Sequence, residues 1–230
     1  MGRVGLVVSV IIVIVLILIS VIVIVLSLTP ITQPIIVHGM VINISTTYKD
    51  KDQAIELMYE CNSRMIKLLE HLRAKYYIGA TDDECGVACK TRRQAKEYAD
   101  ARATIEHLLR GFNYEAIHEN IPSSVGNTAY SLDKGRTIML CLRDVRPPHN
   151  IVDINTLMFV IIHEAAHIAN WTEWGHGPLY WSIFKFLLRE AARIGVYDPI
   201  DYARTPATYC SFHLDHNPLF DRTIQTAYQN

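Results

Sequence analysis

The chain has 230 residues, a formal net charge of −1 at pH 7 and 50% hydrophobic residues. This length allows one membrane segment and one domain of ordinary size. The near-zero net charge excludes binding to nucleic acid or to an anionic surface through overall charge alone.

The first 28 residues hold much of the hydrophobic content. From Val4 to Leu28 the sequence is almost entirely Val, Ile and Leu, and these 25 residues carry no charge. A helix needs roughly 20 apolar residues to cross the hydrocarbon layer, whereas the apolar region of a cleavable signal peptide has about 7–15. We therefore predict an uncleaved, single-pass N-terminal membrane anchor over residues 1–28, with the lipid bilayer as its partner through residues 4–28.

The compartment of the remaining chain is left open by the sequence. Arg3 is the only charged side chain before Lys49, so the positive-inside rule favours a cytosolic N-terminus. Cys85 and Cys89 fit either a disulfide or two buried thiols. The Asn-Ile-Ser triplet that begins at Asn43 is a glycosylation acceptor by pattern, which has meaning only if the domain faces a secretory lumen.

Two segments separate the predicted anchor from the last part of the chain. Residues 29–50 are predicted as a juxtamembrane connector, in which Ile35–Ile44 is apolar enough for a strand or for a stem near the bilayer. Residues 51–112 are predicted as a helical region. Apolar residues three, four and seven apart predict a helix from Asp52 to about Tyr77, and a second helix is expected from Thr91 to Leu109.

Residues 113–230 are predicted as the functional domain, of the α+β class with a small sheet. A β-hairpin is expected over residues 127–143. The triplet Asp133-Lys134-Gly135 is a turn signal, and a strand-like run follows it from Thr137 to Leu142.

Two helices are expected after this hairpin. Asp153 is a good N-cap for a helix that runs from Ile154 to about Asn170. After a break with two glycines, Pro178 stands where the first turn of the next helix begins. That helix is predicted to end near Ile194.

The first of these two helices carries the segment His163-Glu164-Ala165-Ala166-His167. Residues four apart lie on one face of a helix, so both imidazoles can reach one ion. Zinc accepts neutral imidazole nitrogen at about 2.0–2.1 Å. Glu164 is placed to act as general base toward a metal-activated water. In so apolar a helix, buried histidines and a glutamate without partners would be costly, which favours a metal site over a structural role.

A third ligand is needed, because catalytic zinc usually takes three protein ligands and leaves a fourth position for water. Glu173, His176 and Glu190 are the candidates that follow His167. We favour His176, since a glycine on each side lets the backbone turn back toward the metal. Glu190 in the next helix is the rival, and Glu173 fits a solvated loop residue. The predicted site is one Zn²⁺ per chain, bound by His163, His167 and His176.

The motif His163-Glu164-x-x-His167, followed by Gly175-His176-Gly177-Pro178-x-Tyr180-Trp181, resembles the WLM and SprT-like zinc metallopeptidases. The likeness covers roughly residues 113–220 and is closest to WLM-like proteins of large DNA viruses. Further stretches that carry it are residues 127–135, residues 139–143 and Tyr209-Cys210. The resemblance implies a zincin fold, in which an active-site helix is followed by a helix that holds the third ligand. It also implies peptide-bond hydrolysis.

The resemblance further implies a strand beside the cleft and a group that stabilises the oxyanion. The strand would be Arg136–Leu142, where an extended substrate binds by main-chain hydrogen bonds. Tyr180, Tyr209 and His213 are candidate oxyanion donors. Tyr180 and Trp181 are more typical of packing residues at this spacing, so the sequence does not assign the oxyanion donor.

Three functions follow from these patterns. The leading one is a membrane-anchored zinc metallopeptidase that hydrolyses a peptide or protein substrate. The second is a membrane or virion structural protein that retains a catalytically silent zincin domain. The third is a protease for proteins crosslinked to DNA, as some relatives of the family are. The lack of a basic tail and of zinc-finger spacing argues against a nucleic-acid partner.

Overall fold

The computed structural model describes residues 3–28, 32–76, 92–121, 129–146 and 148–228. Its contacts divide the chain into two compact units, Met1–Ile31 and Thr32–Asn230. The first unit holds helix α1 (Arg3–Leu28), and the second holds the sheet and the other described helices.

The prediction of a membrane anchor is corrected by the structure. Within the part of the chain that is described, no helix is both long and apolar enough to cross a membrane. This finding overturns the single-pass anchor over residues 1–28, the transmembrane helix in the predicted fold class and the membrane localisation.

The second unit is built on a five-stranded sheet with the order β1-β2-β3-β5-β4. The strands are β1 (Thr32–Val37), β2 (Met40–Ser45), β3 (Ile117–Asn120), β4 (Ala129–Leu132) and β5 (Thr137–Cys141). The pairs β1–β2 and β4–β5 are antiparallel, whereas β2, β3 and β5 run parallel. Strand β4 therefore forms an edge of this sheet, and β5 is an interior strand.

The segment predicted as a connector contributes two of these strands. Residues 32–45 form the β1–β2 hairpin, so the strand alternative for this stretch is confirmed. Asn43 lies in β2 between two neighbouring strands, is 9% exposed and donates from Nδ2 to the carbonyl of Ile117 at 3.3 Å. A buried asparagine in an interior strand offers no surface to a glycan, so the sequence pattern at Asn43 does not mark an accessible acceptor.

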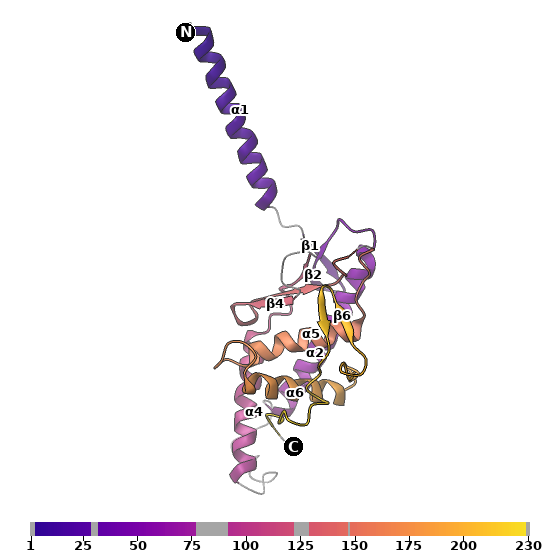
Figure 1. Cartoon of the computed structure of the whole chain (residues 1–230). Coiled ribbons are helices and arrows are strands. Elements are labelled where there is room, and N and C mark those ends of the chain that lie inside the picture. Colours follow the sequence, from indigo (N-terminus) through magenta and orange to yellow (C-terminus); the bar gives the residue numbers. More distant parts are fainter. Residues whose placement is uncertain (1–2, 29–31, 77–91, 122–128, 147, 229–230) are drawn as a thin grey trace. The chain divides into compact units, whose positions relative to one another are not determined.

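Four helices lie where periodicity and caps predict them. They are α2 (Lys51–Tyr76), α4 (Arg92–Gly111), α5 (Ile154–Ala169) and α6 (Pro178–Arg193). Helix α5 contacts α2, α4, α6 and strand β4. Figure 1 shows these helices grouped on one side of the sheet. Residues 51–112 are thus part of the same compact unit as residues 113–230.

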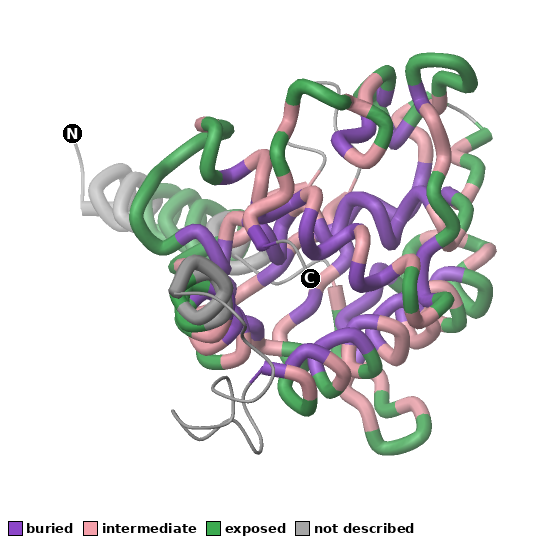
Figure 2. Tube along the Cα trace, turned by 90° about the horizontal axis from the view of Figure 1, so that it is seen from below, coloured by how far each residue is buried: buried purple, intermediate pink, exposed green. Residues whose placement is uncertain are grey.

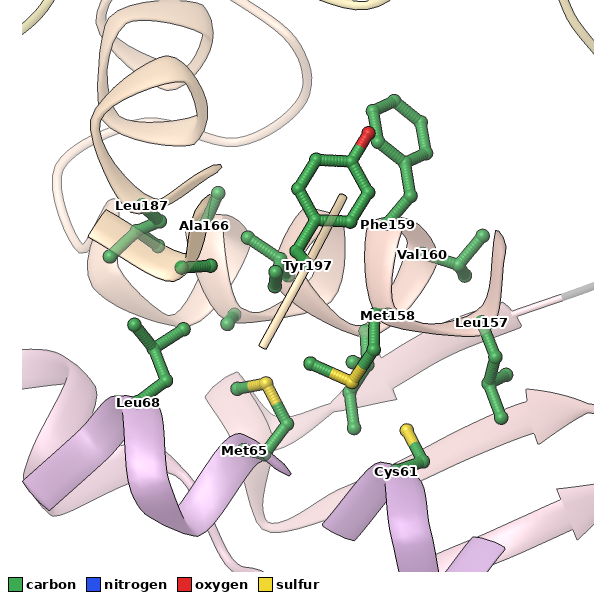
Figure 3. Packing of buried hydrophobic residues seen from close by; sticks show 14 of the residues in the cluster. Cys61, Met65, Leu68, Leu157, Met158, Phe159, Val160, Ala166, Leu187 and Tyr197 are labelled. Atoms are coloured by element: carbon green, nitrogen blue, oxygen red, sulfur yellow. The ribbon is translucent and has the colours of Figure 1, made fainter. Parts of the chain in front are cut away.

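Helix α5 lies in the centre of the hydrophobic core. Nearly all of its side chains are buried, and the buried segments gather in the middle of this unit (Figure 2). Figure 3 shows Cys61, Met65 and Leu68 of α2 facing Leu157 and Met158 of α5. Because a buried helix with many neighbours has little freedom to move, α5 is a rigid support for the side chains that it carries.

A disulfide joins the sheet to the C-terminal part of the chain. Cys141 at the end of β5 is bonded to Cys210, which lies between strands β6 (Ala207–Tyr209) and β7 (Phe212–Leu214). The sequence patterns gave no pairing for these two residues, which are 69 positions apart. Cys85 and Cys89, whose pairing was left open, lie outside the described residues.

A buried ion cluster joins the ends of the parallel strands. Arg143, just after β5, is fully buried and hydrogen-bonded to Glu119 at the end of β3. Its Nε and Nη2 also donate to Asp50 Oδ1 at 3.1 and 3.0 Å. Glu119 accepts in turn from the backbone N–H of Ser45 at 2.7 Å. Because Arg143 and Glu119 are buried and both have partners, this cluster holds the C-terminal ends of β2, β3 and β5 next to one another.

The turn between β4 and β5 is held tightly against α4 and α5. Asp133, Lys134 and Gly135 all have positive φ, of 47°, 54° and 98°. A Cβ at Gly135 would lie 2.5 Å from the carbonyl oxygen of Gly111 and 2.6 Å from Ile168 Cδ1. Only glycine fits this close approach of two backbones.

We expect Gly135→Ala to lower the free energy of unfolding by about 2–3 kcal/mol, since it combines an unfavourable φ with a backbone clash. Gly195→Ala is the matched control. It has a φ of 70° and no heavy atom within 4 Å of the added Cβ, so it should cost only about 1 kcal/mol. Urea denaturation of the full chain measures both values. Equal losses would contradict the close contact at Gly135.

Candidate metal centre

Helix α5 presents two of the three histidines. Asp153 caps its N-terminus, with Oδ1 accepting from the N–H of Thr156 at 2.8 Å. One turn separates His163 from His167, and their ring centroids are 5.0 Å apart. Because both rings project from one face of a buried helix, their positions are set by the core and not by a loop.

The third histidine lies in the segment that connects α5 to α6. Gly175 has a φ of 84°, and Gly177 is the N-cap of α6 with Pro178 at its first position. This path brings His176 back over α5. Its Nε2 lies 3.1 Å from Nε2 of His163 and 3.1 Å from Nε2 of His167.

The convergence of the three nitrogens fits a metal ion. All three ligand atoms lie within 4.8 Å of one another. In a neutral imidazole Nε2 is either a donor or an acceptor, so hydrogen bonds cannot satisfy a nitrogen that faces two others of its kind. Two nitrogens bound to tetrahedral zinc at about 2.0–2.1 Å lie roughly 3.3 Å apart. His163, His167 and His176 therefore have the chemistry and the spacing of a zinc site.

The surroundings keep these histidines uncharged. Burial and the charges of the other two histidines lower the pKa of His163 to about 3. Burial, His176 and Lys134 lower the pKa of His167 to about 4, and burial lowers the pKa of His176. Metal binding requires the neutral imidazole, so the triad is in its ligand form at pH 7.

Glu164 lies beside the triad but is not among the three grouped ligands. Burial raises its pKa to about 7, and hydrogen bonds from the hydroxyl and backbone of Ser131 act in the opposite direction. The positive charge of a metal ion would also lower this pKa. Because burial raises the pKa of Glu164 and the hydrogen bonds lower it, this carboxyl group can accept or donate a proton near neutral pH.

The two other candidates for the third ligand have different roles. Glu190 is fully buried at the α2–α6 interface, where its Oε2 lies 2.9 Å from Nε2 of His71 and 3.1 Å from Nζ of Lys75. Burial alone would raise the pKa of Glu190, but these two contacts and Arg193 outweigh it and lower the pKa. The carboxylate of Glu173 lies next to Gly177 at the start of α6. His176 is thus the candidate that the structure brings to the motif histidines.

The candidate oxyanion donors do not face the cavity at the triad. Tyr180 is fully buried, stacks on His167 with ring centroids 4.4 Å apart and donates to the carbonyl of His163 at 3.4 Å. Tyr209 is buried and His213 is exposed on β7, and neither lines the cavity. The structure supports the packing role for Tyr180 and assigns an oxyanion contact to none of the three.

A cavity of about 300 Å³ adjoins the triad. Strand β4 borders it with Ala129, Tyr130 and Ser131, and the segment before α6 borders it with Glu173 and Trp174. The strand beside the cavity is therefore β4. The predicted strand, Arg136–Leu142, corresponds to interior strand β5, which pairs on both sides. A cavity of about 440 Å³ between α2 and α4 is larger, but no triad residue lines it.

Sequence reasoning missed two residues that line this cavity. Ser131 hydrogen-bonds Glu164, and Lys134 lies close enough to His167 to affect its pKa. The turn signal at Asp133-Lys134-Gly135 located Lys134 in the chain, but did not indicate that the turn approaches α5. That approach depends on packing between residues far apart in sequence.

Comparisons with known proteins found relatives in large viruses. The chain is 34% identical over 128 residues to the uncharacterized protein R325 of Acanthamoeba polyphaga mimivirus, a match that covers 56% of this chain and 64% of the relative. It is 35% identical over 92 residues to the uncharacterized protein 136R of Invertebrate iridescent virus 6, covering 40% and 51%. Against the uncharacterized protein 042R of Invertebrate iridescent virus 3 it is 38% identical over 151 residues, covering 64% and 91%.

The chain thus spans less than two thirds of the length of the first two relatives. No family model and no solved structure matches the chain.

We expect His176→Ala to weaken zinc binding by the full chain at least about 100-fold, because it removes one of three ligands. Competition with a zinc-chelating dye measures the affinity. Glu173→Ala and Glu190→Gln are matched controls that should retain about one zinc per chain. Unchanged affinity in His176→Ala would show that another group completes the site.

We expect Glu190→Gln to lower the free energy of unfolding by about 2–3 kcal/mol at pH 7, because it replaces a fully buried carboxylate, which Lys75 and Arg193 contact, by a neutral amide. The pKa of Glu190 is lower in the folded chain than in the unfolded chain, where it is about 4.3. Its contribution is therefore present above that pH and is lost as pH falls through the folded pKa. Urea denaturation at pH 7 and pH 3.5 should show a smaller difference between the two proteins at low pH. A pH-independent difference would contradict the charged role.

Proposed function

The chain belongs to the family of the uncharacterized protein 042R of Invertebrate iridescent virus 3, and from its histidine triad we propose that it is a zinc-dependent metallopeptidase of the WLM/SprT-like kind. The observation that carries this proposal is the approach of His176 Nε2 to both motif histidines at 3.1 Å, with Glu164 beside them. Three histidine ligands, with an adjacent carboxyl group that can act as general base, are typical of a hydrolytic zinc site.

His163, His167 and His176 would hold one Zn²⁺. When bound, zinc acts as a Lewis acid that polarises a peptide carbonyl and lowers the pKa of water. Glu164 takes the proton from the attacking water and passes it to the leaving amine. Tyr180 would orient two of the ligands. Its ring stacks on His167, and its hydroxyl donates to the backbone carbonyl of His163.

An extended peptide has a place to bind along β4. This strand pairs with β5 on one side, and its other side borders the cavity at the triad. Main-chain hydrogen bonds to a sheet edge supply affinity for an extended peptide. The hydrogen bond between Ser131 of β4 and Glu164 keeps this edge next to the base. The proposed substrate is therefore a peptide or protein segment in extended conformation.

We expect Glu164→Gln to retain about one zinc per chain and to lower peptide hydrolysis by about 10²–10⁴-fold, because glutamine cannot accept the proton. Zinc content and the cleavage of a mixed peptide library are measured on the full chain. Glu56→Gln, at an exposed position of α2, is the matched control and should hydrolyse at the wild-type rate.

Full hydrolysis by the Glu164 variant would exclude the proposed base. If the wild-type chain binds zinc and cleaves no peptide, the silent zincin domain is the better description.

A further inference from the structure

The ammonium group of Lys134 lies in the cavity beside the triad without a carboxylate partner among the described residues. Lys134 and His167 line the same cavity. Its Nζ donates to the carbonyl of Asn170 at 3.0 Å and lies 4.2 Å from the ring centroid of Trp174. An ammonium group has three donors, and one backbone carbonyl and a ring face leave room for a further acceptor.

The position of Lys134 is fixed by packing. It is the middle residue of the turn pressed against Gly111 and Ile168, and its own φ of 54° is costly for a residue with a side chain. Such a conformation persists only where neighbouring contacts determine it. The cation is therefore held at the cavity wall, with Asn170 at the end of α5 as its anchor.

The other charged groups of the cavity do not neutralise Lys134. The carboxylate of Glu173 lies beside Gly177 at the N-terminus of α6, where the helix dipole favours a negative charge. Glu164 is hydrogen-bonded to Ser131. An anion that enters the cavity thus meets a cation whose nearest described partners are neutral.

We propose that Lys134 binds a carboxylate of the substrate, so that this site prefers peptides with an acidic side chain or a free C-terminus at one defined position near the scissile bond. The inference rests on the proposed peptidase function for the identity of the ligand as a peptide. A charge pair at a half-buried site contributes a preference of about 5-fold, which is reduced by salt.

The test measures binding separately from hydrolysis. Zinc-loaded full-length Glu164→Gln is titrated by calorimetry with acetylated, amidated pentaalanines that carry a single Glu or a single Gln at each position. A pentaalanine with a free C-terminal carboxylate distinguishes the second source of the anion. We expect one position, or the free C-terminus, to bind about 5-fold more tightly than its neutral counterpart. Adding Lys134→Gln should abolish this ratio, and Lys134→Glu should transfer the preference to a Lys peptide.

Control variants separate the cation from the fold. Lys134→Arg retains the charge and should keep the preference, while Lys67→Gln, at an exposed position of α2, should not change it. Zinc content and melting temperature report whether a Lys134 variant is folded.

A preference for Glu that survives Lys134→Gln would come from the metal ion and would overturn the inference. Equal affinity for Glu and Gln peptides at every position, or no binding of either, would also overturn it.

The same peptides with wild-type Glu164 keep the two proposals apart. If they bind with a Lys134-dependent ratio but are not cleaved, the peptidase proposal fails and the carboxylate site stands. If they are cleaved and Lys134→Gln leaves the ratio of Glu to Gln cleavage unchanged, the carboxylate site fails alone.

Discussion

Three uncharged imidazoles that meet within 4.8 Å are the constraint on which the rest of this structure depends. Burial disfavours the charged form of each imidazole and lowers the pKa of all three, and for His163 and His167 neighbouring charged groups act in the same direction. Even neutral, three nitrogens that face one another cannot all form hydrogen bonds. Such an arrangement is unfavourable by itself, and an ion that accepts all three lone pairs relieves it.

The helix that follows His176 is tied to α2 near its C-terminal end. His176 immediately precedes α6, and α6 is tied to α2 by Glu190 through His71 and Lys75. A shift of α6 along α2 would separate these charges and would move His176 away from α5. Glu190 thus holds α6 against α2 and lies outside the group of three histidines. The helical region before residue 113 is therefore packed against the helix that follows the histidine triad.

Local sequence patterns predicted the helices and the histidines of the site. Contacts between residues far apart in the sequence determined the roles of Glu190 and β4. Periodicity, the Asp153 cap and the glycines around His176 located the two helices and the triad. The choice between His176 and Glu190 depended on α2, more than a hundred residues away, and spacing alone could not decide it. The edge position of β4 likewise follows from β5 pairing with β3, and the Cys141–Cys210 bond from packing. The anchor was predicted from hydropathy alone, and no helix among the described residues is both long and apolar enough to cross a membrane.

The edge strand, the proposed base and the cation are positioned by one helix. Ser131 of β4 hydrogen-bonds Glu164 of α5, and the turn that follows β4 is pressed against Ile168 of the same helix. Lys134 within that turn donates to Asn170 at the end of this helix. These three contacts lie along α5, so the hairpin cannot shift relative to His163 and His167 without breaking them. A peptide paired with β4 would therefore meet the base and the cation at fixed distances, which is the condition that orientation effects in catalysis require.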